Sequence, residues 1–306
     1  MKEIISDKDL KKLFADNKKR VKTFRGKEGN SFLCSGNIAD IIPVLYVMKE
    51  LGGGDLYIRV SDMLPEKDPY ADLYRIFDLN NNSPYLMPLF INKATYDYIK
   101  PFLEMQSYIK SVNIYNGEDI TFNLDLYRCC YYNDNCLNKT QGIRMKTFAE
   151  AWGIKVSFAE PWLEVDNPKN PDRKILVARS IMNHGGDLGY RAISEFLCDN
   201  AFFYGVDLEY TIFSATCGML WRFYATDFTD LARGIKGMEL VMANDCMVYW
   251  LALALGVKEI HYEICPDIYN GINDSPNVKY FLGGTYVSPD IDLSSILKKQ
   301  GKKKNV

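Results

Sequence analysis

The sequence predicts an α/β protein with two mainly parallel β-sheets covered by helices on both faces. Three observations lead to this prediction. Short apolar segments alternate with segments of helical length, a polar segment with two prolines interrupts the alternation near the middle, and the alternation restarts after it. At 306 residues the chain is long enough for two domains of ordinary size. A composition of 47% hydrophobic and 25% charged residues excludes disordered, fibrous and collagen-like proteins.

The first half of the chain predicts the beginning of a parallel sheet. An apolar strand is followed by a turn, an apolar helix and three consecutive glycines that end the helix. Pro101 should break or kink the second helix, because proline lacks the N–H that an interior position donates. Two long stretches rich in Asn, Asp, Pro and Tyr, residues 62–88 and 128–141, are expected to be functional loops. The expected strands are 30–35, 55–60, 112–115 and 120–126, and the expected helices are 38–51 and 95–106.

The polar segment 164–173 is predicted to be the interdomain linker. It separates an N-terminal domain, residues 1–168, from a C-terminal domain, residues 169–306. The regular alternation after it predicts an open sheet of the nucleotide-binding type, whose ligand lies beyond the carboxyl ends of the strands. The expected strands are 174–179, 201–204, 221–224, 239–243 and 259–262, and the expected helices are 190–199, 207–215, 227–237 and 246–256. We expect these two α/β/α domains to face each other across a cleft.

Charge and cysteine usage further limit the class of protein and its cellular compartment. The formal net charge of −2 argues against a generic polyanion-binding protein. Eight cysteines occur without a Cys-x-x-Cys pair and with only two histidines, which predicts buried thiols in a reducing compartment and no metal site. The first residues lack the apolar core of a signal peptide, and the apolar run 247–257 is shorter than the ~20 residues of a membrane span. We therefore expect a cytoplasmic protein.

Both ends of the chain are basic. Residues 1–30 hold ten Lys/Arg against five Asp/Glu, and residues 298–304 hold five lysines. The favoured interpretation is a solvated terminal helix and a frayed tail. The alternative is an electrostatic contact with DNA or with an anionic membrane, which would make the protein membrane-peripheral.

The first candidate site follows strand 30–35, where Ser35-Gly36-Asn37 leads into a helix with Asp40 in its first turn. Gly36 lets the backbone approach a ligand closely, and the free N–H groups of a helix N-terminus attract an anion. Asp40 could act as a general base toward a hydroxyl. The alternative is structural, with Asn37 capping the helix and Asp40 stabilising its first turn.

The second candidate site lies where the strands of the second half end. Arg179 suits a diphosphate because its guanidinium donates in pairs, and His184 adds a titratable donor. The N–H groups of Cys246 and Met247, at a helix start, could bind a phosphate. Glu263 could accept both hydroxyls of a ribose. In the structural alternative Arg179 and His184 are surface residues, Asp245 caps a helix and Trp250 packs in the core.

These segments together resemble the GT-B glycosyltransferases of the ADP-heptose:lipopolysaccharide heptosyltransferase type, glycosyltransferase family 9, and their phage-encoded relatives. The segment 36–43 matches a family pattern in which a Gly-Asp pair begins the first long helix, with Asn37 at the Asp position. The segment 245–256 parallels the start of the family's last helix, with Cys246 at a hydroxyl position and Trp250 at a His position. The segment 203–210 resembles a strand and the following helix start in the family's second domain. The segment 227–235 resembles the helix that precedes the donor loop of that domain.

The resemblance implies a metal-independent and cofactor-independent transfer of a sugar from a UDP- or ADP-linked donor to an acceptor hydroxyl. The N-terminal domain would bind the acceptor near Gly36, with Asp40 and Asn37 as the catalytic residues. The C-terminal domain would bind the donor. The implied donor-binding residues are Arg179, Ser180, His184, Gly205, Asn244, Asp245, Cys246, Met247 and Glu263.

Two classes of acceptor substrate remain as alternatives. One is lipopolysaccharide or another glycan, and the other is a hydroxymethylated DNA base, as in the DNA modification of a phage, which would place the protein in the host cytoplasm. Two further functions stay open. The chain could be a catalytically silent GT-B module that binds a nucleotide or a partner, because Asn37 and Trp250 replace polar family residues. It could also be a nucleotide-sugar epimerase.

Overall fold

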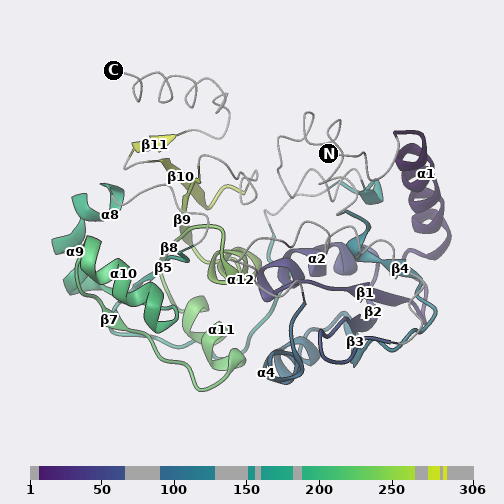
Figure 1. Cartoon of the computed structure of the whole chain (residues 1–306), viewed down its shortest axis with the longest axis horizontal. Coiled ribbons are helices and arrows are strands. Elements are labelled where there is room, and N and C mark those ends of the chain that lie inside the picture. Colours follow the sequence, from purple (N-terminus) through teal and green to yellow (C-terminus); the bar gives the residue numbers. More distant parts are fainter. Residues whose placement is uncertain are drawn as a thin grey trace. The chain divides into compact units, whose positions relative to one another are not determined.

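The computed structural model describes residues 7–65, 90–127, 151–155, 160–181, 188–265, 275–282 and 285–287 (Figure 1). The chain divides into two compact units, each with its own sheet. Unit 1 comprises residues 1–156, 161–167 and 225–233, and unit 2 comprises residues 157–160, 168–224 and 234–306. The α/β class with two parallel sheets, which the alternating pattern predicts, is confirmed.

Unit 1 contains a four-stranded parallel sheet in the order β3-β2-β1-β4. The central strand is apolar because it is buried on both faces, and none of Phe32, Leu33 and Cys34 is exposed. Gly54 begins the second strand with φ +151°, and a Cβ there would lie 2.1 Å from the backbone oxygen of Asn30. The strands are β1 (Ser31–Cys34), β2 (Gly54–Ile58), β3 (Ile109–Ile114) and β4 (Phe122–Asn123).

The end of the predicted strand 120–126 differs from the prediction. Only Phe122–Asn123 pairs as β4, and Leu124–Tyr127 forms a 3-10 turn, η1. The Asn123 side chain accepts a hydrogen bond from the backbone N–H of Asp125 (3.0 Å), which turns the chain away from the sheet. This turn brings the Asp125 carboxylate back to the end of β1, where Ser35 donates to it.

The helices of unit 1 are α1 (Asp7–Phe24), α2 (Ile38–Glu50) and α4 (Lys93–Glu104), and α11 (Phe228–Lys236) begins in this unit. Of the break or kink expected at Pro101, the break is wrong, because α4 continues through this residue to Glu104. The ring of Phe228 packs edge-on against Phe102 of α4, with a centroid distance of 5.2 Å. This contact explains why residues 225–233 belong to unit 1.

Unit 2 contains a seven-stranded sheet in the order β11-β10-β9-β8-β5-β6-β7. Every pair is parallel except β10 with β11. The five predicted strands are present, and β10 and β11 extend the sheet beyond the prediction. The strands are β5 (Ile175–Ala178), β6 (Ala201–Phe203), β7 (Trp221–Arg222), β8 (Leu240–Ala243), β9 (Glu259–Glu263), β10 (Val278–Leu282) and β11 (Thr285–Val287).

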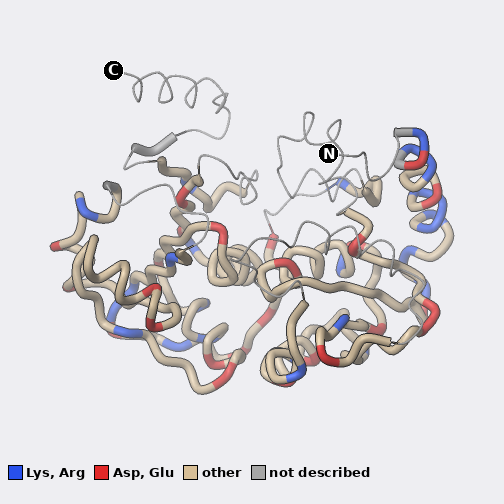
Figure 2. Tube along the Cα trace, in the orientation of Figure 1, with Lys and Arg blue, Asp and Glu red and all other residues tan. Residues whose placement is uncertain are grey.

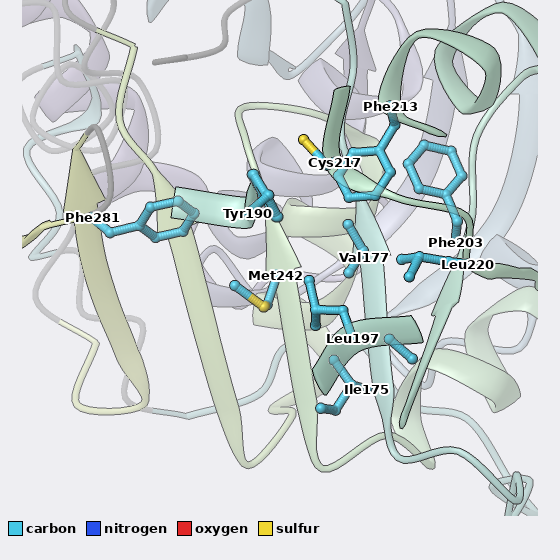
Figure 3. Close-up of a cluster of buried hydrophobic side chains, with 11 residues drawn as sticks. Ile175, Val177, Tyr190, Leu197, Phe203, Phe213, Cys217, Leu220, Met242 and Phe281 are labelled. Carbon is cyan, nitrogen blue, oxygen red and sulfur yellow. The ribbon is translucent and has the colours of Figure 1, made fainter. Parts of the chain in front are cut away.

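The predicted helix 190–199 is divided in two at Ile193, whose backbone is not helical. The helices of unit 2 are α8 (Leu188–Ala192), α9 (Ser194–Asn200), α10 (Asp207–Cys217) and α12 (Met247–Leu255). Figure 3 shows the core of this unit, in which Tyr190 and Phe213 pack over Val177 and Met242 of the sheet. Helix α12 is buried from Val248 to Leu255, as its apolar sequence predicts. None of the described helices has the length and apolar character needed to cross a membrane.

Candidate functional site

The carboxyl edge of the unit 2 sheet is where the strand order brings predicted site residues together. Arg179 follows β5, and Glu263 is the last residue of β9. Arg179 Nε donates to Glu263 Oε2 at 2.8 Å and Nη2 donates to Oε1 at 2.9 Å. The two side chains are 4% and 1% exposed, so this is a buried, bidentate ion pair. A ribose hydroxyl at Glu263 would therefore have to share the carboxylate with Arg179 or displace it.

Asn244 links the ends of β8 and β5 at the same edge. Its Oδ1 accepts from the backbone N–H of Ser180 (2.9 Å), and its Nδ2 donates to the backbone oxygen of Ser180 (2.8 Å). The fully buried amide thus joins the two strand ends just beyond the last backbone pair, Ala178 with Ala243. Asn244 thus holds the backbone of the half-buried Ser180 in place.

Asp245 and Cys246 lead from β8 into α12. The indole Nε1 of Trp250 donates to Asp245 Oδ1 at 2.8 Å within the buried interior. Cys246 is the N-cap residue of α12, and its Sγ lies 3.9 Å from the backbone oxygen of Ala178. Burial raises the pKa of the Cys246 thiol to about 12, although nearby backbone N–H groups act in the opposite direction. The cap therefore carries a neutral thiol at physiological pH.

Tyr190 closes this edge from α8. Its ring lies under the Arg179 guanidinium, with a distance of 5.2 Å from Cζ to the ring centroid. Burial, and then the Glu263 carboxylate, raise the pKa of Tyr190 well above its usual range. Its buried hydroxyl finds no hydrogen-bond partner among the described residues. A neutral phenol and a compensated ion pair therefore form the centre of the edge.

Gly205 lies at the end of the neighbouring strand, β6. A Cβ at this position would lie 2.7 Å from Glu209 Oε2, and that oxygen accepts from the Val206 N–H. The Gly205 backbone oxygen accepts from Arg222 Nη2 at 2.9 Å. A side chain at this position would therefore have to displace the Glu209 carboxylate and the Phe203 ring.

The candidate site of unit 1 lies at the corresponding edge of the four-stranded sheet. Gly36 has φ +112°, a conformation that favours glycine. Asn37 and Asp40 form a capping box at the start of α2: Asn37 Oδ1 accepts from the Asp40 N–H (3.1 Å), and Asp40 Oδ2 accepts from the Asn37 N–H (3.2 Å). The Asp40 carboxylate is half-buried and lies beside the helix N-terminus.

Two charged residues of this edge are absent from the sequence prediction. Asp125 is fully buried and accepts from the Ser35 N–H (3.0 Å) and the Ser35 hydroxyl (2.7 Å). Arg59 follows β2 and is 2% exposed, with its Cζ 5.2 Å from the ring centroid of Tyr115 and 5.8 Å from that of Phe90. Each is the next-to-last residue of a predicted strand, 55–60 or 120–126, so applying the rule of carboxyl ends to every strand would have found them.

The predicted site residues thus have different outcomes. Six of the unit 2 set lie at the ends of β5, β8 and β9, whereas Gly205 lies just beyond the end of β6 and Met247 opens α12. His184 lies outside the described residues. The described residues contain no group of three or more His, Cys, Asp or Glu side chains that could hold a metal ion. The six predicted residues at the ends of β5, β8 and β9 are Arg179, Ser180, Asn244, Asp245, Cys246 and Glu263.

A cavity of about 400 Å³ occurs at the opposite edge of the unit 2 sheet. It is lined by residues that immediately precede the strands, among them Lys174, Glu239 and Lys258. Parallel sheets of this type bind ligands at their carboxyl ends. This cavity therefore lies away from the candidate site.

No protein-family model and no curated protein matches the sequence. Solved structures do match the fold. E. coli heptosyltransferase WaaC with ADP-2-deoxy-2-fluoro heptose is 12% identical over 90% of this chain and 99% of that one, with a TM-score of 0.38. The glycosyl transferase family 9 protein of Veillonella parvula DSM 2008 is 12% identical over 92% of this chain and 91% of that one, with a TM-score of 0.41. The iron-containing dodecameric glycosyltransferase TibC of enterotoxigenic E. coli H10407 is 10% identical over 86% of this chain and 65% of that one, with a TM-score of 0.48.

Proposed function

We propose that this chain is a GT-B glycosyltransferase that moves a sugar from a nucleotide-sugar donor to an acceptor hydroxyl. The observation that carries the proposal is the convergence of polar side chains from three adjacent strand ends, β5, β8 and β9, beside the start of α12. Parallel sheets bind nucleotides at this edge. One of the family motifs quoted from the sequence, 245–256, begins at the end of β8 and covers α12.

The donor would lie against unit 2. Transfer breaks the bond between the anomeric carbon and the diphosphate oxygen, and the diphosphate leaves with the electron pair. Arg179 and the N–H groups of the first turn of α12, from Met247 onward, would neutralise the charge that develops on it. The nearby Ser180 hydroxyl and Glu263 carboxylate would orient the nucleotide. Arg179 would then divide its donors between Glu263 and the diphosphate.

The acceptor would lie against unit 1, near Gly36. The Asp40 carboxylate would take the proton of the acceptor hydroxyl while the hydroxyl oxygen bonds to the anomeric carbon. Asn37 would support this role by donating its backbone N–H to Asp40 Oδ2. The acceptor class is proposed to be a glycan such as lipopolysaccharide, with a hydroxymethylated DNA base as the alternative.

A catalytically silent nucleotide-binding module is the second candidate function. Two hydrogen-bonded arrangements favour it. Arg179 already occupies both oxygens of Glu263, and Trp250 binds Asp245 at the position where the family has His. These contacts stabilise the edge without a ligand, which suits a module that retains the fold and has lost turnover.

A two-stage experiment tests these proposals. The thermal midpoint of the full chain is first measured against UDP-, ADP-, GDP- and CMP-sugars, because a ligand that binds the folded state raises it in a concentration-dependent way. Release of the nucleotide is then followed in the presence of glycan or hydroxymethylated-DNA acceptors. The Asp40→Asn variant keeps an acceptor oxygen for the Asn37 N–H, so it should fold and bind the donor with turnover lost. Its control is Asp62→Asn, which changes an exposed loop carboxylate that likewise accepts one backbone N–H, from Lys93.

The outcomes separate the candidates. Donor binding with turnover that Asp40→Asn abolishes and Asp62→Asn retains supports the transferase. Donor binding without turnover for any acceptor supports the silent module. A midpoint that no nucleotide sugar raises contradicts both.

A further inference from the structure

Helix α1 has two opposite faces. Its packing face consists of half-buried Leu13, Phe14 and Val21 around the buried Asn17, whose side chain donates to the backbone oxygen of Ala151 at 2.7 Å. Arg20 fastens the same helix to unit 1, donating to the backbone oxygen of Thr121 at 2.8 Å. These contacts with the rest of unit 1 fix the rotation of α1 about its own axis, and the opposite face of the helix is exposed to solvent.

The solvent face is an almost unbroken row of lysines. At about 100° per residue, seven residues fall within a sector of about 120° opposite the packing face, and all of these except Ala15 are lysines. All seven are exposed. The blue positions along α1 can be followed in Figure 2. This lysine stripe consists of Lys8, Lys11, Lys12, Lys18, Lys19 and Lys22.

The stripe is a local concentration of charge on a chain whose net charge is −2. Its first and last lysines are 14 positions apart, which corresponds to about 21 Å along the helix. The acidic residues Asp9 and Asp16 lie outside the lysine sector. Because charges are screened over about 8 Å at physiological ionic strength, an approaching anionic surface experiences the stripe rather than the whole chain.

The composition of the stripe distinguishes between partners. Nucleic-acid surfaces combine phosphate contacts with arginine forks, amides or aromatic rings that read or stack on bases, and the stripe has none of these. Lysine ammonium groups on one side of a straight helix can all reach a flat surface together. A cluster of four to eight basic residues on a helix is typical of binding to anionic lipids.

We propose that the lysine stripe of α1 is a docking surface for an anionic phospholipid membrane. The apolar face of α1 is used in packing on unit 1, so the helix lies on the headgroups without inserting and the attraction is electrostatic. Binding should therefore need anionic lipid and should weaken as salt rises. The inference concerns a surface of unit 1 and does not depend on glycosyl transfer.

Vesicle sedimentation of the full chain tests the proposal. Vesicles of phosphatidylcholine alone are compared with vesicles that also contain phosphatidylserine, at low salt and at about 0.15 M salt. The test variant is Lys11→Gln, Lys12→Gln and Lys19→Gln. The matched control changes the same number of charges on exposed lysines elsewhere, Lys110→Gln, Lys155→Gln and Lys258→Gln. Circular dichroism verifies that both variants are folded.

We expect binding to vesicles with phosphatidylserine at low salt and none to phosphatidylcholine alone. The stripe variant should lose on the order of 100-fold in partitioning, and the control should change by a small factor only. Equal losses in the two variants would overturn the proposal, because total charge would then account for the binding. Absence of vesicle binding also overturns it. Salt-sensitive binding to duplex DNA that only the stripe variant loses, without vesicle binding, would assign the stripe to nucleic acid instead.

Discussion

Replacing Arg179 by methionine removes one partner of the buried ion pair that joins the ends of β5 and β9. The methionine retains much of the aliphatic volume, so the main change is the loss of two charge-assisted hydrogen bonds of 2.8 and 2.9 Å. Glu263, which is 1% exposed, is then left as a buried carboxylate without its counter-charge. The variant therefore isolates the electrostatic role of the pair.

The expected loss of unfolding free energy is large because so little of either side chain is exposed to water. Removing one partner of a buried pair costs about 3–5 kcal/mol in the free energy of unfolding. Replacing both partners by apolar residues removes the uncompensated charge as well. The double variant Arg179→Met with Glu263→Leu should therefore lie within about 2 kcal/mol of the parent chain. The exposed pair of Lys93 and Asp97 is the control, and Lys93→Gln should cost no more than about 0.5 kcal/mol.

Urea titrations at pH 7 measure these differences as shifts in midpoint at constant slope. Hydrogen exchange read peptide by peptide assigns each loss to unit 1 or unit 2, since the two units have separate sheets. A cost of less than about 1 kcal/mol for Arg179→Met would refute the stabilising role of the ion pair, as would a double variant that loses as much as the two single variants added together.

Three further changes have defined outcomes. Trp250→Phe should lower the free energy of unfolding by about 1–3 kcal/mol, read from the urea midpoint, because Asp245 Oδ1 loses a buried hydrogen bond from the indole. Asp125→Asn should cost a similar ~1–3 kcal/mol by the same measurement, since an amide offers one acceptor oxygen to the two donors of Ser35, and an unchanged midpoint would contradict this. The folded chain raises the pKa of Cys246 to about 12, so stability present below its ordinary value of about 9 is lost as the pH rises toward 12. Cys246→Ser should make the decline of unfolding free energy over this interval less steep, and equal slopes would contradict the inference.

Local sequence determined most of the strands and helices. Apolar runs such as 31–34 and 175–178 became buried parallel strands because both faces of each sheet are covered. The apolar segment 246–256 became α12, which Gly256 ends in a left-handed conformation. These features follow from hydrophobic periodicity and glycine conformation, which are local properties that the sequence displays directly.

Other features depended on contacts between distant parts of the chain. The strand β10 follows a segment rich in Asn, Asp and Pro, and its place in the sheet comes from pairing with β9. After the turn at Asn123, the Asp125 carboxylate accepts from Ser35, 90 residues earlier, and this contact holds the end of the predicted strand 120–126 away from the ladder. Neither pairing has a local signal.

For the candidate site, the sequence by itself determined six of the residues that gather at the carboxyl edge of the unit 2 sheet, because strand ends can be recognised from apolar runs. It predicted Arg179 and Glu263 there as two separate ligand-binding groups. Only the tertiary structure decided that they bind each other. In the strand order β9-β8-β5 their strands stand two spacings apart, about 10 Å, and the long arginine side chain bridges that distance. Strand order is a property of the whole sheet, and a buried carboxylate requires a counter-charge wherever that order supplies one.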